Sequence, residues 1–237
     1  MDQIIEEIIQ TLQDSVDEKT LKNSPRFFKE KIKIHGVNTA TVGKIAKQYW
    51  KQIEKLGKQE IFTLCEELLS TGYCEEAFIV SAWVPHLADE FQAGDIYIFK
   101  EWINKYIDNW AKCDGFCNHT VGDLIMKHPQ NVEELKIWAK TDQRWLKRAA
   151  AVTLILPARK GKYLQDVFEI AGTLLTDPDD MVQKGYGWML KEASRLHQKE
   201  VFQFVMDHKK EMPRTALRYA IELMPDDLRK AAMEKDW

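Results

Sequence analysis

Tryptophan and charged residues recur together at helical spacing in two parts of the chain. Trp110 and Asp114 are four residues apart, so their side chains share one face of a helix. Lys184, Trp188 and Lys191 repeat this spacing later in the sequence. Tryptophan faces attract cations, and an ionised carboxylate stabilises positive charge that develops beside it. Because a charged residue next to a tryptophan is hard to bury, we expect Trp110 and Trp188 to line a polar cleft.

Other patterns that could carry chemistry are weak or missing from the sequence. Cys113 and Cys117 are four residues apart with His119 nearby, but a structural zinc site needs four ligands. Cys65 and Cys74 do not supply a second pair, so we expect all four cysteines to be small buried residues. The sequence contains no HExxH motif, no glycine-rich phosphate loop and no GxSxG motif. It therefore predicts neither a metal nor a cofactor.

The elements that position these residues are predicted to be helices. Eleven glycines and seven prolines are few for a β-rich protein, and they divide the chain into segments of helical length. Apolar residues recur at three- and four-residue intervals within residues 4–12, 45–56 and 61–69, which predicts an all-α protein. Four further tryptophans are expected in the core: Trp50, Trp83, Trp138 and Trp145.

An internal repeat is visible in the second half of the chain. Asp114, Arg148 and Lys184 are spaced 34 and 36 residues apart, and another basic-apolar segment begins at Arg214. A period in the mid-thirties with two helices per unit is typical of a helical solenoid. We therefore expect a right-handed α-α superhelix of HEAT-like repeats with a concave groove. No Gly/Ser-rich linker interrupts the sequence, which predicts a single domain over residues 1–237.

Composition and charge limit the cellular setting and the partners. The first residues, MDQIIEEIIQ, are acidic where a secretory signal would be basic, and the apolar run 149–156 is too short to span a bilayer. We expect a cytoplasmic protein that does not contact a membrane. The net charge of −3 argues against a dedicated nucleic-acid binder. Basic residues are nevertheless concentrated in one stretch, at Arg144, Lys147, Arg148, Arg159, Lys160 and Lys162. This cluster indicates either solvated helix faces or a surface that binds the phosphate backbone of a nucleic acid.

Three separated stretches resemble the AlkD family of DNA alkylation-repair glycosylases in order, spacing and residue type. They are NWAKCD at residues 109–114, WLKRAA at 145–150 and QKGYGWMLK at 183–191. The Gly36-Val37 turn and the KIAK segment at 44–47 are similar to the N-terminal repeat of that family. The resemblance covers nearly the whole chain.

The resemblance implies an enzyme whose repeats hold duplex DNA. We expect it to act without a cofactor, and the ordinary ends of the solenoid favour a monomer. Its activity would be the removal of cationic N3- and N7-alkylated purines. Asp114 would be the catalytic aspartate, and Trp110 and Trp188 the aromatic residues of the cleft. The residues implied to contact DNA are Arg148, Lys191, Lys184, Phe27 and Lys147.

The chain departs from the family pattern mainly where the family contacts DNA. Phe27 stands where tyrosine is common, Ala40 and Gly43 replace proline and arginine, and Lys191 replaces arginine. Lysine lacks the planar fork with which arginine binds phosphate. Asp114 is retained. Two alternatives therefore remain beside the glycosylase: an inactive nucleic-acid-binding module and a protein-interaction scaffold.

Overall fold

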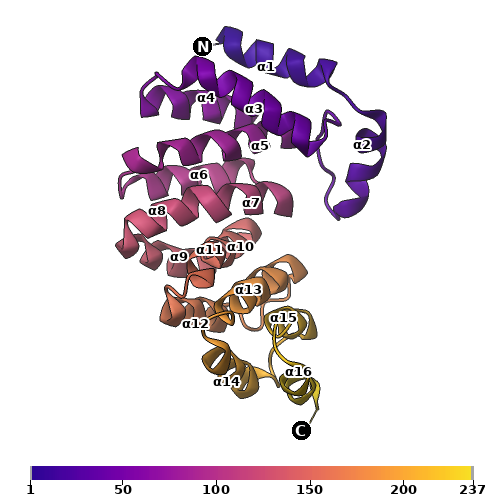
Figure 1. Cartoon of the computed structure of the whole chain (residues 1–237), viewed down its shortest axis with the longest axis vertical. Coiled ribbons are helices and arrows are strands. Elements are labelled where there is room, and N and C mark those ends of the chain that lie inside the picture. Colours follow the sequence, from indigo (N-terminus) through magenta and orange to yellow (C-terminus); the bar gives the residue numbers. More distant parts are fainter. Residues whose placement is uncertain (1, 236–237) are drawn as a thin grey trace. The chain divides into compact units, whose positions relative to one another are not determined.

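The structure is a computed structural model that describes residues 2–235 (Figure 1). Every regular element within these residues is helical, which confirms the predicted all-α class. Contacts gather into two compact units, residues 1–120 and 121–237, which are described separately below. The expected single domain over residues 1–237 stays a prediction. Over the described residues, no helix has both the length and the apolar character needed to cross a membrane.

The first unit is a stack of paired helices. α3 packs against α5, and α5 packs against α7, while α4 lies against both α5 and α6. Figure 1 shows α2 and the turn after it to the right of α3, beyond one end of that helix. The elements are α1 (Asp2–Asp14), α2 (Glu18–Asn23), the 3₁₀ turn η1 (Ser24–Phe27), α3 (Thr39–Ile53), α4 (Lys58–Ser70), α5 (Cys74–Trp83), η2 (Val84–Glu90), α6 (Asp95–Tyr106) and α7 (Trp110–Phe116).

The second unit repeats this arrangement after a π-helical turn, η3 (Cys117–Val121). α10 packs against α13, and α13 packs against α15. α9 packs against α10, and α12 packs against α13. The elements are α8 (Gly122–Lys127), η4 (Pro129–Asn131), α9 (Val132–Ala139), α10 (Arg144–Val152), α11 (Ile155–Arg159), α12 (Leu164–Thr173), α13 (Asp180–Ala193), α14 (Gln198–His208), α15 (Arg214–Ala220) and α16 (Asp226–Met233).

One helix of each repeat begins at a regular interval along the chain. In the first unit these helices begin at residues 39, 74 and 110, and in the second at residues 144, 180 and 214. Each start follows the previous one by 34 to 36 residues. The predicted helical-repeat fold is confirmed, and the period holds in both units. It places Trp110 at the start of one such helix and Trp188 in the middle of another.

The core confirms part of the prediction about tryptophans. Trp83 and Trp138 are buried, but Trp50 and Trp145 are only half-buried, so for these two the prediction was wrong. Trp50 stacks on His86 with ring centroids 4.5 Å apart. The Trp145 ring lies 4.8 Å from the guanidinium carbon of the neighbouring Arg144. Both rings cover a polar neighbour, which is why helical spacing alone misassigned them.

All four cysteines are buried and unpaired by disulfides, as expected. Burial raises the pKa of the Cys74 thiol to about 11 and raises that of Cys65 further. Such thiols are protonated at neutral pH and are poor nucleophiles and poor metal ligands.

Candidate functional site

Helix α7 carries the first half of the predicted site. Asn109 caps the helix: its side-chain oxygen accepts a hydrogen bond from the backbone N–H of Lys112 at 3.1 Å. The same amide group donates to the Cys74 sulfur on α5 at 3.5 Å. Lys112 is almost fully buried, and its ammonium group donates to the Gly72 carbonyl at 2.8 Å. These contacts fix the start of α7 against α5, and with it the position of Trp110.

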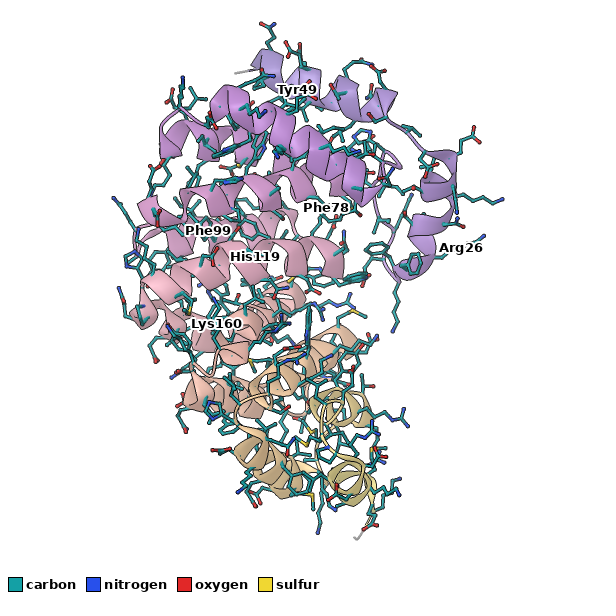
Figure 2. All side chains as sticks on the ribbon, viewed as in Figure 1. Arg26, Tyr49, Phe78, Phe99, His119 and Lys160 are labelled. Carbon is teal, nitrogen blue, oxygen red and sulfur yellow. The ribbon has the colours of Figure 1, made fainter. Side chains whose placement is uncertain are left out.

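Trp110 is held by the segment that follows α2. Its indole Nε1 donates to the backbone carbonyl of Phe27 at 3.3 Å, and its ring stacks on Phe28 with centroids 5.3 Å apart. Phe27 itself points away, with 75% of its surface exposed. Figure 2 shows Arg26 at the edge of the unit on the same turn. The turn thus packs the Phe28 ring against Trp110 and leaves the side chains of Phe27 and Arg26 exposed, where a partner can reach them.

Two buried glutamates at the start of α5 anchor the strand-like segment between this turn and α3. The Glu75 carboxylate accepts hydrogen bonds from the backbone N–H groups of His35, Gly36 and Val37 at 2.8–3.1 Å. Glu76 lies 2.8 Å from the His35 ring nitrogen. Gly36 has a φ of +95°, and a Cβ there would lie 2.6 Å from Cβ of Leu21, so only glycine fits this turn.

A cavity of about 350 Å³ lies between this segment and α7. Phe78, labelled in Figure 2, contributes from α5. The lining is largely apolar, with Asn38 and Glu75 among its polar members. The residues around it are Thr20, Ser24, Phe27, Phe28, Ile32, Ile34, Val37, Asn38, Thr39, Cys74, Glu75, Phe78, Trp110 and Ala111. Trp110 and Phe27 are therefore two residues of the predicted site that border this cavity in the first unit.

Asp114 lies one helical turn after Trp110, on the same face of α7. It is half-buried, so its carboxylate is neither in the core nor fully solvated. The adjacent Gly115 lets α7 approach α5, because a Cβ there would lie 3.5 Å from Oγ of Ser81. An aromatic face and a partly accessible carboxylate on one turn can stabilise a cation placed beside α7.

Helix α13 carries the second half of the predicted site. Asp179 caps it by accepting from the backbone N–H groups of Met181 and Val182. The helix approaches α15 very closely at Gly187, where a Cβ would lie 2.7 Å from Cβ of Tyr219. That contact fixes the rotation of α13, so that Trp188, the next residue, is only half-buried.

Trp188 is held by a residue that the sequence analysis did not single out. Its Nε1 donates to Oε1 of Glu192 at 3.4 Å, one helical turn further on. The other oxygen of Glu192 accepts from Nε of Arg159 at 2.7 Å and from Nε of Arg195 at 2.6 Å. Burial raises the pKa of Glu192, but the hydrogen bonds from Arg195 and Arg159 outweigh this effect and lower the pKa overall. Glu192 is therefore an ionised, buried anchor for the indole.

The predicted DNA-binding lysines are each paired with a carboxylate. Lys184 lies 3.2 Å from Asp180, and Lys147 lies 2.5 Å from Asp177. Lys191 lies 3.1 Å from Glu222 and 5.9 Å from the centre of the Tyr219 ring. Each side chain remains partly exposed. A phosphate would have to compete with these partners, which lowers the positive potential that the lysines offer.

Arg148 occupies a different environment from the one that the sequence suggested. It is 5% exposed, and its Nη1 donates to the backbone carbonyl of Met181 in the first turn of α13. Its side chain packs against Gly185, where a Cβ would lie 3.5 Å away from it. In the structure Arg148 thus joins α10 to α13. Its implied contact with DNA stays a prediction.

Within each unit the structure brings some predicted residues together. Trp110 contacts the Phe27 carbonyl and shares one face of α7 with Asp114, and Lys184, Trp188 and Lys191 follow one another along α13. Phe28, Glu192 and Arg195 were missed. Glu192 could have been found from its four-residue spacing to Trp188. Phe28 could not, because its contact with Trp110 joins residues more than eighty positions apart.

No group of three or more histidine, cysteine or acidic side chains that could hold a metal occurs among residues 2–235. Cys113 and Cys117 are both fully buried, and His119, labelled in Figure 2, is exposed.

Comparisons with known proteins identify the family to which the chain belongs. A family model described as "DNA alkylation repair enzyme" matches residues 8–224. A solved structure, described as a predicted DNA alkylation repair enzyme from Enterococcus faecalis, has a similar fold, with a TM-score of 0.81 and 15% sequence identity. The alignment covers 91% of this chain and 100% of that one. A search of curated protein sequences gave no match. With a family model matching almost its whole length, the chain belongs to the AlkD-like family of DNA alkylation repair enzymes.

Proposed function

We propose that the protein is a monofunctional DNA glycosylase that removes cationic N3- and N7-alkylated purines, such as 3-methyladenine and 7-methylguanine, from duplex DNA. The observation that carries this proposal is the position of Asp114, half-buried and one turn after Trp110 on α7. Membership of the DNA alkylation repair family supports DNA as the substrate.

The chemistry needs no metal and no strong general acid. An alkylated purine already carries a positive charge, so the electrons of the breaking N-glycosidic bond neutralise it and it leaves as a neutral base. Positive charge then develops on the sugar, as in the oxocarbenium-like transition states of glycoside hydrolysis. The Asp114 carboxylate stabilises this charge and orients the water that adds to C1′. That water gives up a proton as the sugar hydroxyl forms.

The tryptophans act on the same charges. A cation within about 6 Å of an indole face gains roughly 0.5–2 kcal/mol, depending on how far it is desolvated. Trp110 is oriented for this role by Phe27 and Phe28, and Trp188 by Glu192. Arg148, Lys147, Lys184 and Lys191 are proposed to contact the DNA backbone. In this proposal the enzyme acts as a monomer in the cytoplasm and uses no cofactor.

A base-release assay tests the proposal. The purified chain is incubated with methylated duplex DNA, and free 3-methyladenine and 7-methylguanine are measured by chromatography. We expect release by the native chain, and its loss in Asp114→Asn at an unchanged unfolding midpoint. Asp142→Asn, which alters an exposed carboxylate, is the matched control and should keep full activity. Turnover that survives in Asp114→Asn would contradict the assigned mechanism.

If the native chain binds duplex DNA without releasing a base, the protein is instead a non-catalytic nucleic-acid-binding module. Binding that falls with rising salt and does not respond to Asp114→Asn would identify that function. A protein-interaction scaffold, the third alternative, predicts no DNA binding at moderate salt.

A further inference from the structure

One buried carboxylate holds two arginines at the end of α13. Oε2 of Glu192 accepts from Nε of Arg159 at 2.7 Å and from Nε of Arg195 at 2.6 Å. The Glu192 side chain is 3% exposed, whereas the two arginine side chains are 47% and 45% exposed. Both Nε atoms touch the same oxygen, so the two guanidinium groups are close neighbours with outward-facing ends.

This arrangement leaves positive charge unbalanced. A single carboxylate neutralises one of the two arginines. Only the Nε atoms of Arg159 and Arg195 bond to Glu192, and their Nη groups have no hydrogen-bond partner within residues 2–235. One arginine is enough to neutralise the buried carboxylate. The second adds a further positive charge beside the first, and the two guanidinium groups repel each other.

Two lysines on the neighbouring turn extend the same surface. The turn after α11 packs against the turn after α13: the His197 ring nitrogen lies 3.1 Å from the Gly161 carbonyl, and a Cβ on Gly161 would lie 3.1 Å from Leu196. Lys160 and Lys162 flank Gly161 and are exposed; Figure 2 shows Lys160 at the edge of its turn. Neither ammonium group has a partner within the described part of the chain.

Glu200 lies beside this surface, with its carboxylate 3.9 Å from Nδ1 of His197 on the turn after α13. We call the set Arg159, Lys160, Lys162 and Arg195 the α11–α13 basic surface. It carries four positive charges beside the two negative charges of Glu192 and Glu200.

The position of this surface links it to the proposed site. Glu192 follows Trp188 by four residues, about 6 Å along α13, and holds the indole with its other oxygen. The same carboxylate therefore contacts both the Trp188 indole and the two guanidinium groups. Guanidinium groups suit phosphate because their planar fork can donate two parallel hydrogen bonds.

We propose that the α11–α13 basic surface binds the phosphate backbone of duplex DNA, with Glu192 setting the spacing of Arg159 and Arg195 and tying them to Trp188. This inference rests on the proposed function for its choice of ligand. It adds a contact outside the residues implied by the family resemblance. The lysines of that implied set are already paired with carboxylates, whereas the outer ends of these arginines are not.

The test measures binding of the full chain to a fluorescein-labelled, undamaged DNA duplex by anisotropy over a range of KCl concentrations. Arg159→Gln with Arg195→Gln should weaken binding roughly tenfold or more, the size expected for losing a hydrogen bond to a charged group. The slope of log affinity against log salt should fall by about 1.8, because each lost phosphate contact contributes about 0.9. Lys160→Gln with Lys162→Gln, which leaves Glu192 paired, should lower the slope in the same direction.

Lys210→Gln with Lys230→Gln is the matched control, because both lysines are exposed and the charge change is equal. If the double arginine variant fails to fold, the triple variant Arg159→Gln, Glu192→Gln and Arg195→Gln is used in its place. The triple variant also removes the buried carboxylate that the double variant leaves without an arginine partner. The proposal is overturned if the native chain does not bind the duplex at about 50 mM KCl, or if the slopes of the basic-surface variants equal that of the control.

Base release from methylated DNA, measured in parallel, separates the two ideas. If the native chain releases bases and the basic-surface variants bind DNA like the control, this inference is contradicted and the proposed function stands. If the variants change the slope of log affinity against log salt but the native chain releases no base, the proposed function is contradicted and the inference stands.

Discussion

The indole Nε1 of Trp110 donates a hydrogen bond to the backbone carbonyl of Phe27 at 3.3 Å, although 83 residues separate them in the chain. Phe28, the next residue, stacks on the same indole. The orientation of Trp110 therefore depends on a turn that belongs to the N-terminal repeat. Substitutions in that turn should therefore alter the position of Trp110 at the start of α7.

Phe28→Ala should affect stability and base release much more than Phe27→Ala. Loss of the stacked ring should cost about 0.5–1.5 kcal/mol of unfolding free energy and should slow base release, because Trp110 loses its support. Phe27 is 75% exposed, so its removal should change stability by no more than about 0.5 kcal/mol. Urea unfolding and the base-release assay measure both effects. Equal destabilisation by the two variants would show that the stack does not position Trp110.

Glu75→Gln should loosen the segment that covers the cavity beside Trp110. The carboxylate accepts three backbone N–H groups, and an amide would turn its NH₂ group toward at least one of them. We expect a loss of about 1–3 kcal/mol in unfolding free energy, the usual penalty for leaving a buried donor unpaired. Glu6→Gln, on the exposed face of α1, is the matched control and should leave the urea midpoint unchanged.

Glu192→Gln should change how stability depends on pH. The pKa of Glu192 is lowered in the folded chain, so the folded state binds fewer protons than the unfolded state in acid. The contribution of Glu192 to the free energy of unfolding is fully present above the pKa of this group in the unfolded state, about 4.3. It is lost as the pH falls through the lower pKa that Glu192 has in the folded state. The variant should therefore be less stable at pH 7, by about 1–3 kcal/mol.

The difference between the two proteins should shrink in acid. Urea unfolding at several pH values measures it, with Glu211→Gln as an exposed control that should follow the native curve. A constant difference from neutral pH into acid would mean that Glu192 is not held ionised by Arg159 and Arg195.

Helical spacing predicted the fold well because each repeat buries one face of each helix. It correctly gave the repeat period and placed Trp110 with Asp114 on one turn. It failed for Trp145, since a ring that covers the neighbouring arginine has the same spacing as a ring in the core. The spacing of residues in the sequence shows only which residues are neighbours along the chain, and not which residues of other helices they contact.

The environment of the basic residues could not be read from the sequence for the same reason. Arg148 is buried against Met181 and Gly185, and Lys147 is paired with Asp177, all at least thirty residues away. A cluster of basic residues in sequence therefore divides into interhelical contacts and exposed cations. Which residue takes which role depends on packing between repeats.

Two glycines on α13 should respond in opposite ways to substitution by alanine. At Gly187 a Cβ would lie 2.7 Å from Cβ of Tyr219 and 2.8 Å from the Ala216 carbonyl, so α15 would have to move. Such overpacking typically costs about 1–3 kcal/mol. At Gly185 the nearest atoms, on Arg148, are 3.5 Å away, which is ordinary contact, and alanine should add up to about 1 kcal/mol through helix propensity.

Thermal unfolding distinguishes the two, because 1 kcal/mol shifts the midpoint by about 2–4 °C in a chain of this size. Gly187→Ala should lower the midpoint and Gly185→Ala should raise it. Gly43→Ala, in open space on α3, should also raise it and serves as a propensity control in the other unit. Because Trp188 follows Gly187 directly, the displaced helix should also slow base release in Gly187→Ala. A Gly187→Ala variant with a native midpoint would show that α13 and α15 are not packed as closely as the structure places them.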